Sequence, residues 1–246
     1  MMMLLWVGLA FAGPQEDYEA GIAALRAGDD ATAVAKFSAA LEGGGRDPAV
    51  YHGLGNALYR QQKLGAAIAA WERGHRLSPG NGDIAANLER ARKETRDRLA
   101  PPAPAVGPFF WQRWLAPRQS AVLASLAVTV GLSLWAVGVG VGVGTGRRLR
   151  RLAAGLCAAG ALLVASTGWA LRQAQTAVVT ADEIVVKSAL GPAGVDLFSL
   201  HAGAAVELLE QTEPDAALIG LSDGRKGWAP RSVLIVTDPG APFPTD

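Results

Sequence analysis

Two long apolar runs occupy the middle of this 246-residue chain. Neither the run over residues 120–143 nor the run over residues 152–171 contains a charged side chain. A helix rises about 1.5 Å per residue, so about 20 residues cross the hydrocarbon core of a bilayer and each run is long enough to do so. Two buried helices of a soluble core are the alternative, but soluble helices of that length normally carry a polar face.

A short arginine-rich spacer separates the two apolar runs. Short loops rich in Lys and Arg stay on the cytoplasmic side of a membrane, so the spacer predicts a cytoplasmic turn between two spans over residues 119–172. The parts before and after the hairpin then lie together on the opposite face. The residues expected to set this topology are Arg147, Arg148, Arg150 and Arg151.

Small residues recur at intervals of four within both apolar runs. Gly138 and Gly142 form one such pair, and Gly155 and Ala159 form another. Small residues at this spacing let membrane helices approach closely, so these four positions are predicted to pack the two spans together. Neither span contains an ionisable side chain, which argues against an ion pathway through this chain alone.

The chain begins with a further apolar stretch over residues 1–12, which ends in Ala10-Phe11-Ala12 before Gly13. An apolar core of this length followed by A-x-A is typical of a signal peptide, although the usual basic residues are missing. Residues 1–13 are therefore expected to be a signal peptide or an N-terminal anchor. Either outcome exports the segment that follows.

Residues 14–99 contain an internal repeat. A shift of 34 residues aligns Gly21 with Gly55 and Phe37 with Trp71. A period of 34 with small residues at close helix contacts resembles the tetratricopeptide (TPR) repeat, which implies two helix pairs. A further helix over residues 83–99, with Asp83 as its N-cap, is expected to cap the second pair with a polar outer face.

A linker over residues 100–118 joins the repeats to the first span. Its Pro-rich beginning predicts a stiff, extended segment. The aromatic and basic residues that follow are typical of an interfacial anchor at the membrane surface. These residues are Phe109, Phe110, Trp111, Arg113, Trp114 and Arg118.

Residues 177–237 predict a small all-β domain. Five short β-branched clusters are separated by Gly, Pro and Asp signals, and Asp223-Gly224 is typical of a hairpin turn. The segments around His201 and Trp228 resemble a bacterial SH3-like domain, which implies a small barrel. Trp228 is compatible with a core position and with a ligand platform, and residues 238–246 are expected to be a disordered tail.

No catalytic pattern accompanies these modules. The three histidines, His52, His75 and His201, are scattered and have no partner at metal-ligand spacing, so no metal site and no cofactor are predicted. The single cysteine, Cys157, lies inside the second apolar run. A net charge of +1 without a basic stripe argues against nucleic-acid binding. The chain is therefore expected not to be an enzyme.

The order of the modules resembles one known family. Asn87-Leu88-Glu89 and residues 177–188 carry the closest likeness to the BatE group of the aerotolerance-operon (Bat) proteins. This resemblance implies a bacterial inner-membrane protein that works with Bat proteins bearing von Willebrand A domains and, indirectly, with a MoxR-type ATPase.

The sequence thus predicts a multidomain protein made of an all-α TPR solenoid, a two-helix transmembrane hairpin and a small SH3-like barrel. Its expected function is that of a periplasm-facing scaffold whose TPR groove binds a partner protein. Binding of the cell wall (peptidoglycan) through the SH3-like tail is the alternative. The residues predicted to line the groove are Tyr18, Ile22, His52, Asn56, Tyr59 and Arg60.

Overall fold

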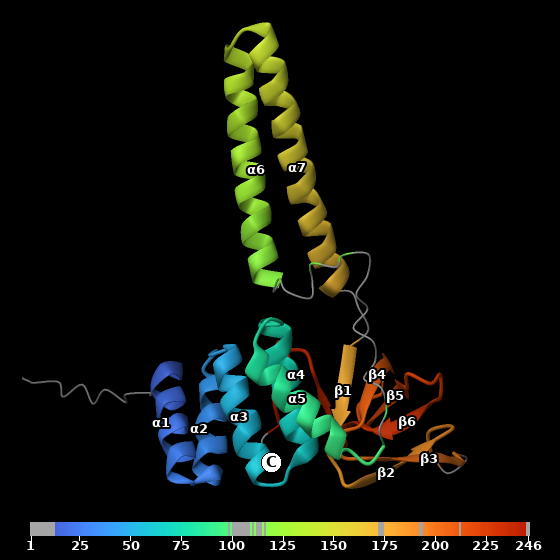
Figure 1. Ribbon diagram of the computed structural model, residues 1–246. Coiled ribbons are helices and arrows are strands. Elements are labelled where there is room, and N and C mark those ends of the chain that lie inside the picture. The colour runs from blue at the N-terminus through green and yellow to red at the C-terminus, as the bar shows by residue number, and fades with distance from the viewer. Residues whose placement is uncertain are drawn as a thin grey trace, which may run out of the picture.

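The structure, a computed structural model, describes residues 13–97, 99, 109, 111, 115, 117–171, 175–191, 194–211 and 213–244. Five helices come first, a long helical hairpin follows, and a β-sheet comes last (Figure 1). The predicted signal peptide or anchor, apart from Gly13, and most of the predicted linker lie outside the described residues.

The N-terminal region consists of two helix pairs and a fifth helix. The helices are α1 (Pro14–Ala27), α2 (Asp30–Glu42), α3 (Pro48–Arg60), α4 (Leu64–Leu77) and α5 (Gly82–Glu94). Local signals set several of their ends: the side chains of Asp29 and Asp47 cap α2 and α3, and Gly28 ends α1 at a φ of 83°.

Helix α5 differs from its prediction at both ends. Its N-cap is Asn81 rather than Asp83, because the Asn81 side chain accepts hydrogen bonds from the backbone N–H groups of Asp83 and Ile84. It ends at Glu94 rather than at residue 99. Thr95 is extended and its hydroxyl donates to the Arg92 carbonyl, which ends the helix before Asp97.

The 34-residue repeat of the sequence is also a repeat of contacts. A Cβ atom added at Gly21 would lie 2.8 Å from Phe37, and one added at Gly55 would lie 2.4 Å from Trp71 Nε1. In both pairs the aromatic ring of the second helix rests on the backbone of the first. Only glycine leaves room for that approach, which explains why both positions lack a side chain.

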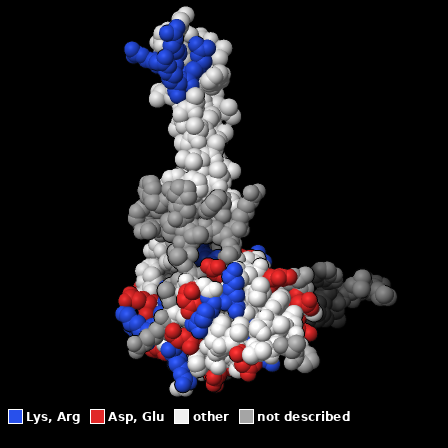
Figure 2. All heavy atoms as spheres, turned by 90° about the vertical axis from the view of Figure 1, so that its right-hand side faces the viewer, with Lys and Arg blue, Asp and Glu red and all other residues white. Residues whose placement is uncertain are grey.

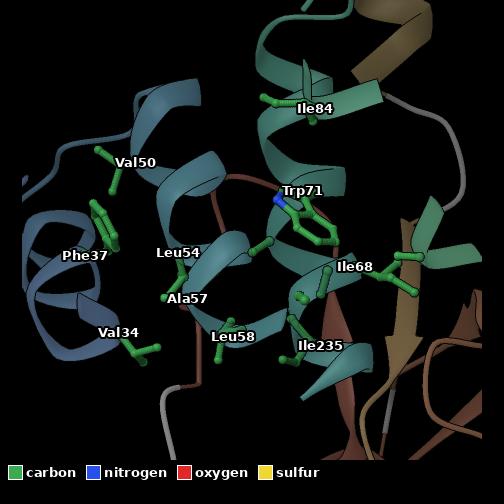
Figure 3. Close-up of a cluster of buried hydrophobic side chains, with 14 of the residues drawn as sticks. Val34, Phe37, Val50, Leu54, Ala57, Leu58, Ile68, Trp71, Ile84 and Ile235 are labelled. Atoms are coloured by element: carbon green, nitrogen blue, oxygen red, sulfur yellow. The ribbon is translucent and has the colours of Figure 1, made fainter. Parts of the chain in front are cut away.

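The hydrophobic core of the helices continues into the sheet. Phe37, Leu54 and Trp71 belong to one buried cluster, and Ile235 of the last strand joins the same cluster (Figure 3). Val178 of the first strand is also a member and is 1% exposed. The helical region and the sheet therefore share a core, although the sequence divides them into separate domains.

The hairpin is built from α6 (Pro117–Gly140) and α7 (Val143–Leu171), which lie side by side over their length (Figure 1). The segments Gln119–Gly140 and Val143–Gly168 are long and apolar enough to be possible membrane spans. The prediction of two such helices agrees with the structure. The orientation of the hairpin across a membrane stays a prediction.

The arginine-rich spacer is not the turn of the hairpin, and this corrects the sequence interpretation. The turn lies at Val141 and Gly142, and residues 147–151 belong to the first turns of α7. Arginine and leucine are good helix formers, whereas the glycine-rich stretch before them favours a turn. The four arginines consequently extend α7 instead of linking two helices.

Three of the four positions predicted to pack the two spans together lie outside the contact between α6 and α7. Gly138 does face α7, because an added Cβ would lie 3.1 Å from Arg150 Cγ. Gly142 lies in the turn, and Gly155 and Ala159 are exposed. The close contacts involve buried residues of a different stripe: Ala124, Gly131, Gly146, Ala153 and Gly160.

The C-terminal region is one antiparallel sheet of seven strands in the order β3-β2-β6-β5-β4-β1-β7. The strands are β1 (Gln175–Val179), β2 (Glu183–Lys187), β3 (Asp196–His201), β4 (Ala205–Glu210), β5 (Ala216–Gly220), β6 (Lys226–Pro230) and β7 (Leu234–Val236), with the short helix η2 (Arg231–Val233) before β7. The predicted Asp223-Gly224 turn joins β5 to β6, and Gly224 has a φ of 89°.

The closed barrel predicted from the SH3-like resemblance is not what the structure shows. Strands β3 and β7 are the two edges of the sheet, and no pairing joins them in the described residues. Strand β7 is three residues long and lies, with β1, against α4. The helical region thus covers this end of the sheet, so the core is sealed without closure of a barrel.

The predicted disordered tail packs against the helices as far as Phe243. Arg73 of α4 is 0% exposed, and its guanidinium donates to the carbonyl oxygens of Val236, Ala241 and Pro242 at 2.7–3.1 Å. The Phe243 ring lies 4.8 Å from the guanidinium carbon. A buried guanidinium needs such partners, and the C-terminal backbone supplies them.

Candidate functional site

A solvent-facing hollow of about 290 Å³ lies on the helical region. Its walls come from four helices, α1, α3, α4 and α5, so it exists only when both repeats and the fifth helix are in place. It is lined by Leu25, Asn56, Tyr59, Arg60, Trp71, Asn87 and Arg90. We refer to this hollow, together with the adjacent His52, as the groove.

An amide and imidazole network forms one wall of the groove. Asn87 Nδ2 lies 3.0 Å from Asn56 Oδ1 and 3.1 Å from His52 Nε2. The Trp71 indole N–H donates to the same Asn56 oxygen at 3.2 Å. Asn56 Oδ1 already accepts two hydrogen bonds, and Asn56 Nδ2 lies 3.4 Å from His52 Nε2, so one N–H of the Asn56 amide remains for a ligand.

His52 acts as an acceptor in this network. Burial lowers the pKa of His52 from its ordinary value, and the nearby Asp83 carboxylate opposes that shift. A neutral imidazole has one acceptor nitrogen, and Nε2 facing Asn87 Nδ2 takes that role. The network therefore holds the two asparagine side chains in defined orientations.

Tyr59 and Arg60 lie at the groove but already have partners within the chain. The Tyr59 hydroxyl donates to Glu94 Oε1 at 2.6 Å, and this hydrogen bond raises the pKa of Tyr59. Arg60 Nε lies 3.1 Å from Asp30 Oδ1, and its NH1 donates to the Leu25 carbonyl at 2.9 Å. Arg60 thus ties α3 to the end of α1 and the start of α2.

Tyr18 and Ile22 lie apart from the other predicted groove residues. They line a second hollow, of about 390 Å³, whose lining residues all come from α1. The Tyr18 ring also packs on Phe37, with 6.1 Å between the ring centroids. The structure brings His52, Asn56, Tyr59 and Arg60 together in one place, and it puts Tyr18 and Ile22 in another.

Four groove residues were not among the predicted ones: Leu25, Trp71, Asn87 and Arg90. Asn87 and Arg90 come from α5, which the sequence interpretation treated as a cap with a solvated outer face. Trp71 was matched with Phe37 as a packing residue, and that role is correct, but its indole N–H also reaches the groove. The i, i+3 spacing of Asn87 and Arg90 was the available signal, because it puts both on one face of a helix.

Arg90 differs from the other polar groove residues. Its side chain is exposed, and no hydrogen bond or ion pair to it occurs within the part of the chain that the structure describes. With Arg90 and the amide of Asn56, the groove presents donors over an apolar floor formed by Leu25 and Trp71. Such a surface suits an extended peptide segment with carbonyl or carboxylate oxygens.

The described ranges contain no group of three His, Cys, Asp or Glu side chains placed to hold a metal ion. The side chains that line the groove offer hydrogen bonds and apolar contact. No family model, no curated protein and no solved structure matches this chain.

Proposed function

We propose that this protein is a membrane-anchored scaffold whose groove binds a segment of a partner protein. The observation that carries the proposal is the groove itself, which has the oriented Asn56 amide, an arginine without an ion pair among the described residues, and an aromatic floor. In this proposal α1–α5 are two TPR-type repeats with a cap helix. The 34-residue repeat of glycine–aromatic contacts supports that assignment.

The hairpin supports the anchoring part of the proposal. Both of its ends return to the body formed by the helices and the sheet (Figure 1). A two-span insertion would leave the groove and the sheet on one side of the membrane, with only the tip of the hairpin reaching the other side. The arginines at the tip favour a cytoplasmic location for the tip and therefore a periplasmic location for the body.

The proposed partners are other membrane proteins of the same assembly. The resemblance to BatE points to Bat-type proteins with von Willebrand A domains, and through them to a MoxR-type ATPase. A groove of this size buries a short segment only, so micromolar or weaker binding is expected.

Site-specific photo-crosslinking in membranes tests the proposal. A photoreactive amino acid at Arg90, on the rim of the groove, avoids the internal partners that Asn56 and Arg60 have. The matched position is Arg231, an exposed arginine on the sheet region. A defined adduct with one protein from position 90 and none from position 231 supports the scaffold, whereas the same adducts from both positions would refute the groove assignment.

A further inference from the structure

The tip of the hairpin carries a cluster of exposed arginines in a regular helix. Arg147, Arg148 and Arg151 are exposed, and Arg150 is half-buried beside Gly138 of α6. All four belong to about one and a half turns of α7, within about 6 Å along the helix axis. Helical geometry places Arg147, Arg148 and Arg151 within about 100° of one another around α7, so these three share one face.

No acidic side chain balances this cluster. The sequence contains no Asp or Glu between Asp97 and Asp182, a stretch that includes the whole hairpin. Within the described residues, no ion pair or side-chain hydrogen bond involves Arg147, Arg148 or Arg151. Figure 2 shows basic side chains gathered at the tip, at the far end of an uncharged shaft. The cluster thus has capacity for an anionic ligand.

The position of the cluster along α7 indicates what surrounds it. If Leu152 marks the edge of the hydrocarbon, the helix continues past Arg147 by four residues, which is about 6 Å. The polar headgroup layer on each side of a bilayer is about 6 Å thick. Arg151 to Arg147 then lie about 2–8 Å beyond that edge, at the depth of the lipid phosphates, and only the uncharged beginning of α7 extends past the headgroup layer.

The position of Trp135 supports the same depth of the arginine cluster in the membrane. Trp135 of α6 is 48% exposed and lies one helical turn before Gly138, which contacts Arg150. Exposed tryptophan at the end of a span is typical of the membrane–water interface. The part of the tip beyond the arginines, residues 141–146, carries no charged side chain, so the arginines at phosphate depth are the charged groups of the tip and lipid is the occupant that this geometry favours.

We propose that Arg147, Arg148 and Arg151, assisted by Arg150, bind the phosphate groups of anionic phospholipids in the leaflet that the tip reaches. The guanidinium group offers a planar fork of N–H donors that matches phosphate oxygens in a bidentate way. Three such groups on one helical face can hold one or two phosphates at once. This inference rests on the proposed anchoring of the hairpin in a membrane.

Lipid retention by the purified full-length chain tests the inference. The delipidated protein in a non-ionic detergent is titrated with phosphatidylglycerol or with phosphatidylcholine, and bound lipid is counted by native mass spectrometry. Each arginine removed near a membrane surface is expected to weaken binding about fivefold. The triple variant R147Q/R148Q/R151Q should thus bind phosphatidylglycerol on the order of 100-fold more weakly, with its weak binding of phosphatidylcholine unchanged.

A matched variant separates the cluster from overall charge. R26Q/R96Q/R231Q removes three exposed arginines from the helical and sheet regions, so both variants have the same net charge. This control should keep the wild-type preference for phosphatidylglycerol. An equal loss in both variants would overturn the inference. Displacement of the lipid by free inorganic phosphate would also overturn it, because the site would then recognise a soluble anion.

Alkaline extraction of membranes distinguishes a failure of the inference from a failure of the anchoring. Wild type and triple variant should both stay in the membrane after extraction, because the apolar shaft is unchanged. A wild-type protein that stays in the membrane but shows no lipid preference would overturn the inference alone. A wild-type protein that is extracted would overturn the anchoring and the lipid site together.

Discussion

Asp97 and His201 join the helical region to the sheet. His201 Nδ1 lies 2.7 Å from Asp97 Oδ1, and the His201 backbone N–H donates to Asp97 Oδ2 at 2.6 Å. Asp97 follows the last helix before the hairpin, and His201 ends β3. Both carboxylate oxygens are thus used across 104 residues of sequence, and they fix the segment that follows α5 to the end of β3.

Loss of this carboxylate should loosen the contact between helices and sheet. Asp97→Asn replaces one acceptor oxygen by an NH2 group, so one of the two donors of His201 loses its partner, and we expect the free energy of unfolding to fall by about 1–3 kcal/mol. Urea unfolding of the full chain in detergent measures the change. Asp182→Asn, at an exposed aspartate, is the control and should be neutral. Equal stability of D97N and wild type would contradict the prediction.

The free energy of unfolding of the protein should decrease in acid because of His52, which lies beside the groove. Burial lowers the pKa of His52 in the folded state, so the unfolded state binds more protons once the pH falls below the unfolded value of about 6.5. The contribution of neutral His52 to the free energy of unfolding is complete above that pH and decreases as the pH falls toward the pKa of His52 in the folded state. The pH dependence of the free energy of unfolding between about pH 7 and pH 5 measures it.

The variant His52→Gln isolates this effect. Glutamine can keep an acceptor oxygen near the position of Nε2 but does not titrate in this range. The stability of H52Q should therefore fall less steeply with decreasing pH than that of wild type. Burial also lowers the pKa of His75, and that residue is present in both proteins, so it cancels in the comparison. Identical slopes would show that His52 is not the group responsible.

The glycine at the second repeat contact should not tolerate a methyl group. In Gly55→Ala the new Cβ would lie 2.4 Å from Trp71 Nε1, which forces the ring away from Asn56. Overpacking of this kind costs about 1–3 kcal/mol, and it opposes a gain of about 1 kcal/mol in helix propensity. Thermal unfolding should show a net loss for G55A. Gly82→Ala, at a helix position with nothing within 4 Å, should be neutral or stabilising.

The contact between α6 and α7 can be tested with the single native cysteine. A Cβ at Gly131 would lie 2.7 Å from Cys157 Sγ, so Gly131→Cys should form a disulfide with Cys157 under mild oxidation. Thiol labelling of the denatured protein before and after oxidation measures the yield. Gly140→Cys, on the same helix but with nothing within 4 Å, should keep both thiols free. Comparable yields in both variants would contradict the observed packing.

The sequence predicted the parts of the fold that depend on strong local patterns. The 34-residue period predicted the helix pairs, and the two uncharged runs predicted the helices of the hairpin. Strands β3 and β6 were not predicted, because Asp196–His201 has no β-branched residue and Lys226–Pro230 contains both Gly and Pro. Four of the six predicted groove residues do meet, because helical spacing within α3 brings them together.

The features that the sequence did not predict arise from long-range contacts. Arg73 reads as one of several solvated helix charges, and only the tertiary fold gives it the carbonyls of Val236, Ala241 and Pro242. The open sheet has the same origin, since α4 covers the β7 end in place of a closing strand. In the hairpin, the choice between two glycine stripes depended on the rotation of α7, which the spacing of glycines alone does not determine.

The buried side chain of Arg73 has a consequence for how the chain is made. Its partners lie 163–169 residues later in the sequence, and the helical core is sealed by Val178 and Ile235. Synthesis from the N-terminus delivers α4 first, then the hairpin, and the residues that cover α4 last. The face of the helical region that these residues cover is therefore exposed until β1, β7 and the segment after β7 have been synthesised. Val178 and Ile235 complete a core whose other buried members come from α2–α5, so a chain truncated before residue 178 would leave this core incomplete.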